Sequence, residues 1–391
     1  MRIVFLTKEA GHSSTPQAIL GERLVKAWSS RGNEVLVVTE SDRPDTADGL
    51  TVKVPKGNQP LVGRLTRLVP GLHRYSHLNL EARNWLRVVR STLRESKPDA
   101  VVTFSNPFWL NAVGLIASKT FPDIRWFAHY SDPLLGSAYK RVWPTEHRPL
   151  VSLERQILQS ADGVIFCNRQ LLEQTLNRHG FATSHKNFWT IPHSYAPTWA
   201  SPSGHPSLAD NTALHLGSLY GPRKPDQVVV AFKECRNLTG TPIKLQFIGA
   251  SQNLRDQSSL AKSLAKNQDW LNFRPPVSYT ASLELMSQAQ ILVSIDSKIG
   301  EPVFLPSKLM EYVGSRRPVM VFSVPGSPAW KLAEEAGFFT LNLLDQNSLP
   351  RLIAEAFEKA KNWSPNESVV QKFSAERVGS AWLSVLRGKR N

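Results

Sequence analysis

Cysteine and long apolar runs are scarce in this chain of 391 residues. It contains only two cysteines, Cys167 and Cys235, and no stretch reaches the roughly 18 consecutive apolar residues that span a bilayer. Two distant thiols match no metal-ligand spacing and provide no disulfide framework, a usage typical of a reducing compartment. The opening residues 1–14 contain an apolar run too short for a signal peptide. We therefore expect a cytoplasmic protein.

Cofactor and metal motifs are also missing. The sequence contains no GxGxxG and no Walker P-loop, which argues against a dehydrogenase and an NTPase. It contains no DxD, no CxxC and no HExxH, so we expect no bound metal. What is present is positive charge: the net charge is +15, and residues 51–98 carry ten Lys or Arg against two Asp or Glu. This balance predicts an anionic partner, such as a nucleic acid, an anionic membrane surface or a phosphate-bearing substrate.

Apolar strands and helices alternate through the first half of the chain. Residues 2–6 have the pattern of a buried strand, 16–31 that of a helix and 34–40 that of a second strand. Further strands are expected at 100–104, 124–130, 163–168 and 188–193, and further helices at 77–97 and 149–160. Strands that are apolar throughout and separated by helices predict a parallel sheet.

A stretch dense in Pro, Ser, Gly and Ala, 196–212, separates this series from a second one. The second series predicts strands at 213–217, 244–249, 291–296 and 318–323, and helices at 224–237, 278–289, 306–315, 328–336, 347–361 and 366–388. We therefore predict an α/β protein of two Rossmann-like domains facing a cleft. Their limits are 1–197, completed by the terminal helix 366–391, then a linker at 198–212 and a second domain at 213–365.

The segment GSLYGPRKPDQVVVAF at 217–232 follows the first strand of the second domain. Its glycine-bearing turn places Arg223 and Lys224 at the start of a helix. Helix N-termini attract anions through unpaired N–H groups and the helix dipole, and two cations there would reinforce binding of a pyrophosphate. A solvated basic loop without a ligand is an equal alternative.

The segment EPVFLPSKLMEYVGSRRPVMVFS at 301–323 is the sharper signal. Pro306 suits the first turn of a helix, and Lys308 and Glu311 share one face near its start. Ser307 and Lys308 would hold phosphate, and Glu311 would accept hydrogen bonds from ribose hydroxyls. The alternative is a Lys–Glu helix pair that binds nothing.

These segments resemble the donor-binding domain of the retaining family-4 glycosyltransferases of the GT-B fold. The resemblance covers the glycine-ended strand and basic turn at 217–224, the IGA loop at 248–250 with Gly249, SQAQILVSIDS at 287–297 and PSKLMEYVGSRRPVMV at 306–321. It implies that Glu311 contacts the nucleotide ribose and that Lys224 contacts the diphosphate.

Two positions depart from the family pattern. Ser218 stands where the family has an arginine directly after Gly217, and Arg223 is the expected substitute. Val303 stands where the first of two glutamates, which touches the transferred sugar, is usual. Glu301, two residues away, is the candidate replacement.

The first half resembles the acceptor domain of the same enzymes. The segment HYSDPLLG at 129–136 follows a predicted strand, and open α/β sheets bind ligands at that edge. His129 and Asp132 are the candidates to meet the sugar or the acceptor hydroxyl, and satisfaction by local backbone is the alternative. Gly11 and His12, in the first loop, are acceptor-side candidates, with a flexible surface loop as the alternative.

A helix at 77–97 combines a basic stripe with an apolar face. Its arginines at 83, 87, 90 and 94 follow helical spacing, and Trp85 and Leu86 belong to another face. A basic surface with Trp and Leu suits an anionic membrane, and Arg83 and Arg87 are candidates for contact with the acceptor. Solvated arginines on an ordinary helix are the alternative.

The resemblance implies a metal-independent, retaining transfer of sugar from a UDP- or GDP-linked donor to an acceptor hydroxyl. We expect a polysaccharide or lipid-linked acceptor at the inner membrane face. A catalytically degenerate GT-B scaffold and a GT-B nucleotide-sugar epimerase are the alternatives. Nucleic-acid binding rests on charge alone, since no recognised motif supports it, and we do not expect it.

Overall fold

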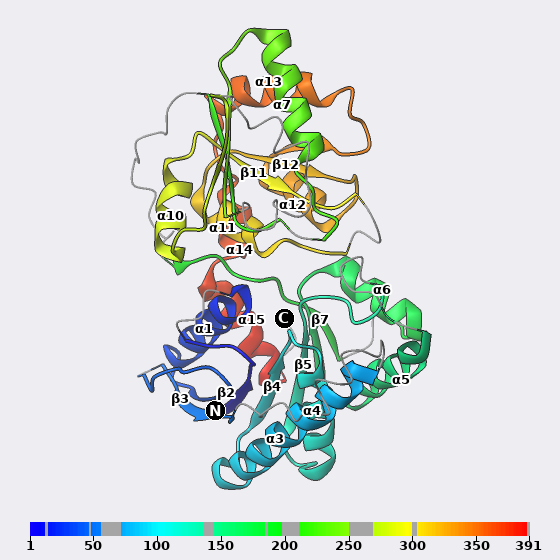
Figure 1. Ribbon diagram of the computed structural model, residues 1–391. Coiled ribbons are helices and arrows are strands. Elements are labelled where there is room, and N and C mark those ends of the chain that lie inside the picture. Colours follow the sequence, from blue (N-terminus) through cyan, green and yellow to red (C-terminus); the bar gives the residue numbers. More distant parts are fainter. Residues whose placement is uncertain are drawn as a thin grey trace. The chain divides into compact units, whose positions relative to one another are not determined.

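The computed structural model describes the chain except residues 12–14, 47, 56–71, 137–141, 143, 184–186, 198–210, 220, 250–268, 299–302 and 389–391; of 72–82, 145 and 146 it describes the backbone alone. The described residues form two units (Figure 1). Unit 1 contains Met1–His193 and Ala375–Asn391, and unit 2 contains Ser194–Ser374. The domain limits proposed from the sequence were 197 and 366. Most of the predicted linker at 198–212 lies outside the described residues.

Unit 1 is built on a seven-stranded parallel sheet with the order β3-β2-β1-β4-β5-β6-β7. Its strands are β1 (Arg2–Leu6), β2 (Glu34–Thr39), β3 (Leu50–Lys53), β4 (Ala100–Phe104), β5 (Arg125–Tyr130), β6 (Gly163–Phe166) and β7 (Phe188–Thr190). Its helices are α1 (Pro16–Ser29), α3 (Leu72–Ser96), α4 (Trp109–Thr120), α5 (Pro144–Ser160), α6 (Arg169–His179) and α15 (Ala375–Leu386). The predicted parallel sheet is confirmed. Every residue of β4 and β6 is buried, which explains their continuous apolar sequence.

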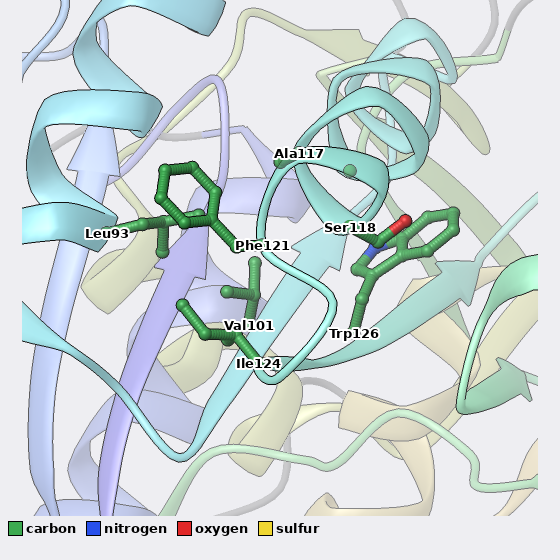
Figure 2. Close-up of a pocket in the computed structure, with 8 residues that line it drawn as sticks. Leu93, Val101, Ala117, Ser118, Phe121, Ile124 and Trp126 are labelled. Atoms are coloured by element: carbon green, nitrogen blue, oxygen red, sulfur yellow. The ribbon is translucent and has the colours of Figure 1, made fainter.

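Helices α3 and α4 pack tightly over β4 and β5. A crevice between these elements has a volume of about 10 Å³, and Leu93, Phe121 and Trp126 are among its lining side chains (Figure 2). That volume holds at most about one water molecule, so the crevice is a packing gap and not a ligand site. A Cβ at Gly114 would stand 2.3 Å from Nε1 of Trp126, so the glycine is what lets α4 approach the sheet.

Unit 2 is built on a six-stranded parallel sheet with the order β10-β9-β8-β11-β12-β13. Its strands are β8 (Thr212–Leu216), β9 (Lys244–Ile248), β10 (Leu271–Arg274), β11 (Ile291–Ile295), β12 (Val319–Ser323) and β13 (Phe339–Asn342). Its helices are α7 (Asp226–Thr239), α10 (Tyr279–Gln288), α11 (Ser307–Ser315), α12 (Pro328–Ala336), α13 (Leu349–Ala360) and α14 (Glu367–Lys372). The edge strands β10 and β13, and also β3 in unit 1, were not predicted from the sequence.

The C-terminal tail differs from the single helix predicted at 366–388. Two helices, α14 and α15, are separated by Phe373 and Ser374, and they belong to different units. Helix α15 packs on α1 in unit 1 (Figure 1), where the rings of Trp28 and Trp382 lie 5.8 Å apart. The prediction that the terminal helix returns to the N-terminal domain is therefore confirmed. The prediction of one continuous helix at 366–388 was wrong.

Each sheet has one point at which the strand order reverses direction. In unit 1 this point lies between β1 and β4, and in unit 2 between β8 and β11. Loops that leave the carboxyl ends of strands at such a point diverge to opposite faces, which leaves room for a ligand. A functional site is therefore expected at these two strand ends. Among the described residues, no helix has the length and apolarity needed to cross a bilayer.

Candidate functional site

Two glycines directly follow the neighbouring strands β8 and β9 of unit 2, and β8 lies at the reversal point. Gly217 follows β8 with φ +99°, and Gly249 follows β9 with φ +86°, a backbone region that favours glycine. The Gly217 N–H donates to the carbonyl of Ile248 at 2.6 Å. A Cβ at Gly249 would stand 3.1 Å from the Cα of Gly217. The two strand-end loops are therefore in direct backbone contact.

Lys308 lies over the loop that contains Gly217. A Cβ at Gly217 would stand 1.9 Å from Cε and 2.0 Å from Nζ of Lys308, so the lysine side chain occupies the space that Gly217 leaves open. Burial, and second the nearby positive charge of Arg223, lower the pKa of Lys308 to about 8. Because burial disfavours the charged form of this lysine, an anion that approaches it would stabilise the ammonium group.

Arg223 supplies a second, more deeply buried cation. Its side chain is 10% exposed, and its Nε lies 3.6 Å from Oδ1 of Asp296, which follows β11. Burial raises the pKa of Asp296, and Arg223 opposes that rise. Counting Lys308, this cluster has two cations and one carboxylate. Its surplus charge is positive, as a site for a phosphate requires.

The start of helix α11 adds backbone donors to the same region. The N-cap, Pro306, makes no side-chain cap hydrogen bond, and Ser307 and Lys308 open the helix. The first N–H groups of a helix have no partner within the helix and carry its positive dipole end. Because Lys308 also touches Gly217, this helix end faces the cation cluster. Lys224, the remaining predicted phosphate ligand, is exposed beside Arg223.

Glu311 lies inside unit 2 and has protein partners. It is 7% exposed, and its oxygens accept hydrogen bonds from the Ala196 N–H at 3.0 Å and from the Tyr279 hydroxyl at 2.9 Å. The next residue, Tyr312, accepts from the Leu216 N–H at 3.0 Å. A carboxylate has about four acceptor positions, so it can accept more hydrogen bonds than these two.

Three residues of this region were missed from the sequence. Asp296 and Tyr279 are described above, and His215 lies within β8, where its Nδ1 is 2.9 Å from the Val293 carbonyl. Burial, and second the charge of Lys308, lower the pKa of His215 to about 3, so the ring is neutral. The signal for Asp296 was its place as a polar residue directly after an apolar strand.

The strand ends of unit 1 place His129 and Asp132 differently. His129 is 1% exposed, its ring stacks on Phe104 at 4.3 Å, and burial holds its pKa well below the usual value. Asp132 is partly exposed and accepts a hydrogen bond from the side-chain amide of Asn106. Asn106 follows β4 and was also missed from the sequence. Of the two predicted residues, Asp132 is the one that the described structure leaves accessible.

Gly11, an acceptor-side candidate, lies in close contact with other residues of the protein. It has φ +70°, its N–H donates to Oε1 of Glu22 at 2.9 Å, and a Cβ would stand 3.2 Å from the Cα of Arg43. The predicted residues His12 and Glu301 lie outside the described residues.

The predicted basic stripe is present on α3. The side chains of Arg83, Arg87 and Arg94 are exposed, that of Arg90 is half-buried, and within the described part of the chain none of the four forms an ion pair. A hollow of about 450 Å³ runs along this face. Its described lining consists of the four arginines with Leu86 and Ser91. The side chains of the first part of α3, residues 72–82, are not described.

No cluster of three or more His, Cys, Asp or Glu side chains suited to a metal occurs among the described residues.

Part of the chain matches a known domain, and nearly the whole chain is similar in fold to solved structures. Residues 21–185 match the model of a glycosyl transferase 4-like domain. No curated protein sequence matches the chain. Solved structures match almost its full length. WaaG, a glycosyltransferase involved in lipopolysaccharide biosynthesis, is 15% identical with a TM-score of 0.66, covering 99% of this chain and 100% of WaaG.

Two further structures illustrate the range of the fold. A UDP-forming trehalose-phosphate synthase from Burkholderia xenovorans is 12% identical with a TM-score of 0.72, covering 99% of this chain and 98% of the synthase. A protein from Listeria monocytogenes, described as a putative UDP-N-acetylglucosamine 2-epimerase, is 14% identical with a TM-score of 0.60, covering 99% of this chain and 96% of that protein. At these identities the similarity shows the fold alone.

Proposed function

We propose that this chain is a glycosyltransferase of the GT-B fold that transfers sugar from a nucleoside-diphosphate sugar to an acceptor hydroxyl. The match of residues 21–185 to a glycosyl transferase 4-like domain supports the proposal. The observation that carries the proposal is the position of Lys308 over Gly217. Together with Arg223 it brings two cations to the carboxyl ends of the central strands of unit 2. A diphosphate is the group that this arrangement suits best.

In this proposal the donor diphosphate binds Arg223, Lys308 and the start of α11, with Lys224 at the edge. Glu311 receives the ribose hydroxyls. As the bond between the sugar and the diphosphate breaks, its electron pair leaves with the diphosphate oxygen. The cations offset that negative charge, so no metal is required. UDP and GDP are the candidate carriers, and UDP is favoured by the synthase of the same fold, which is UDP-forming.

On the acceptor side, a hydroxyl oxygen forms the new bond to the sugar and loses its proton. Asp132 is the candidate to orient that hydroxyl or to accept the proton, since it is partly exposed at a strand end of unit 1. We assign no enzyme nucleophile, and retention of configuration follows the family-4 resemblance. A lipid-linked glycan acceptor is supported by WaaG, which is involved in lipopolysaccharide biosynthesis.

A non-catalytic binding protein is the second candidate, and one observation favours it. Val303 stands at the position of the usual sugar-contacting glutamate, and it is 4% exposed. If Glu301 does not replace that glutamate, the scaffold would bind a nucleotide without turnover. An epimerase is supported only by the shared fold.

Thermal shift with UDP, GDP and ADP is the first test of the donor site. We expect UDP or GDP to raise the melting temperature, with no change on adding EDTA, and Lys308→Ala to abolish the effect. Screening nucleotide sugars for release of nucleoside diphosphate then separates an enzyme from a binding protein. If no nucleoside diphosphate stabilises the wild type, the donor-site proposal fails.

We also propose that α3 contacts an anionic membrane surface through its exposed arginines. Three exposed guanidinium groups on one helix, without acidic partners in the described structure, would each gain energy from anionic headgroups. In co-sedimentation with vesicles of phosphatidylglycerol, Arg87→Glu with Arg94→Glu should lose binding. The matched control is Lys233→Glu with Lys331→Glu, an equal charge change at exposed sites of unit 2. Equal loss in both double variants would contradict a specific role for α3.

A further inference from the structure

A chain of hydrogen bonds ends on the carboxylate that faces Arg223. Ser323, the last residue of β12, donates its hydroxyl to Oδ2 of Asp296 at 3.1 Å. The hydroxyl of Ser327 is 2.7 Å from that of Ser323, and it accepts the Trp330 N–H at 3.1 Å. Both serines are fully buried. The two serine hydroxyls thus link Asp296 to the first turn of α12.

The donors in this chain follow one direction. Ser327 is the N-cap of α12 and receives an N–H of that helix, so its own proton is available for Ser323. Ser323 in turn gives its proton to Asp296. The backbone N–H of Ser297 adds a bond to Oδ1 at 2.8 Å. Hydrogen bonds from Ser297 and Ser323 stabilise negative charge on Asp296, so they oppose the rise in its pKa that burial causes.

The carboxylate acts on the cluster in two ways. It fixes Arg223, whose Nε is 3.6 Å from Oδ1, at the strand ends beside Lys308. It also offsets one of the two positive charges there, since Arg223 and Lys308 repel each other. An Arg223 without this partner would attract a diphosphate more strongly and would make Lys308 still easier to deprotonate.

We propose that Asp296 is a positioning residue that fixes Arg223 and limits the positive charge of the diphosphate site, so that the nucleoside diphosphate is held firmly enough for transfer and is still released. This inference rests on the proposed donor site. The segments that build it (the turn after β8, the end of β11, the end of β12 and the cap of α12) meet only in the folded unit.

Three variants separate charge from geometry. Asp296→Asn keeps the shape and the acceptor toward Ser297, and it removes the charge. Ser323→Ala keeps the charge and breaks the hydroxyl chain. Asp345→Asn, exposed after the edge strand β13 and two strands away from β11, removes the same charge and is the control. Melting temperature without ligand shows whether each variant is folded.

The probes are UDP and GDP, with dissociation constants measured by calorimetry between about pH 7 and pH 9.5, across the range in which a lysine of lowered pKa titrates. We expect Asp296→Asn to bind about three- to tenfold more tightly near pH 7. The pH at which affinity falls should move downward in that variant. Ser323→Ala should bind more weakly with an unchanged pH midpoint, and Asp345→Asn should match the wild type.

The outcomes separate this inference from the donor site on which it rests. If the wild type binds neither nucleotide, the donor-site proposal itself fails. If the wild type binds but Asp296→Asn binds more weakly with an unchanged midpoint, Asp296 is only structural and the inference is overturned. If Asp296→Asn does not fold, Ser323→Ala decides, because affinity equal to the wild type would exclude a role for the hydroxyl chain.

Discussion

The side chain of Lys308 passes directly over the Cα of Gly217, so close that a methyl group there would stand 2.0 Å from Nζ. A Cβ at the end of β8 would therefore displace the tip of Lys308, and the positive φ of the turn separately favours glycine. The two residues are ninety-one positions apart, and their contact links the strand-end loop to the start of α11.

Gly217→Ala should abolish nucleoside diphosphate binding, because the new methyl group displaces Lys308. Gly240→Ala is the matched control: Gly240 also has positive φ, +65°, but a Cβ added there would meet no atom within 4 Å. The left-handed conformation should cost each variant about 1–2 kcal/mol in the free energy of unfolding, measured in urea. Loss of binding in Gly240→Ala as well would mean that backbone strain, and not contact with Lys308, explains the effect.

Nucleoside diphosphate affinity should fall as the pH rises through about 8. The pKa of Lys308 is lowered to about 8, so the side chain carries its charge below that pH and loses it above. Calorimetric titration with UDP and GDP at rising pH measures this. Lys308→Arg is the comparison, since a guanidinium stays charged throughout the range. A flat profile in the wild type would remove Lys308 from the phosphate site.

Glu311 should make the protein prefer a ribonucleotide to a 2′-deoxyribonucleotide. We expect UDP to bind about tenfold more tightly than 2′-deoxy-UDP, the difference of one charge-assisted hydrogen bond, and Glu311→Gln to reduce that ratio. Tyr279→Phe is the control for indirect effects, because it removes a partner of Glu311 and leaves the carboxylate. Equal affinities for both nucleotides in the wild type would leave Glu311 without a role in ribose binding.

Asp132→Asn should lower turnover roughly 100-fold without lowering the melting temperature, if Asp132 orients or deprotonates the acceptor hydroxyl. Asn106→Ala should lower turnover less, because it removes only the amide that donates to Asp132. Asp123→Asn, exposed just before the opposite end of β5, is the control. The assay follows nucleoside diphosphate release from the donor found by screening. Unchanged turnover in Asp132→Asn would exclude it from catalysis.

The central strands were predictable because burial on both faces makes them apolar throughout. β1, β4, β8 and β11 are examples, and each is buried over nearly its whole length. The edge strands β3, β10 and β13 are short and carry exposed or partly exposed residues, so their sequences do not differ from those of loops. The break in the tail at Phe373 and Ser374 also has no Gly or Pro to mark it.

The site was predictable where a residue acts through its own segment. Lys308 was predicted because it lies at the start of α11, and Arg223 because it lies in a basic turn three residues before α7. Asp296 was missed because its role depends on Arg223 and Ser323, which lie far away in the sequence. His129 shows the converse limit, since position after a strand does not reveal that Phe104 covers the ring.

Helices α14 and α15 belong to different units, and this affects the order in which the two units can complete their cores during synthesis. Unit 2 is one uninterrupted stretch, Ser194–Ser374, whereas the core of unit 1 includes Trp382 and Leu386 from α15. During synthesis, the face of α1 that carries Trp28 therefore waits for a helix made after all of unit 2. The usual N-to-C order of domain folding would here be inverted, with the first unit the last to close.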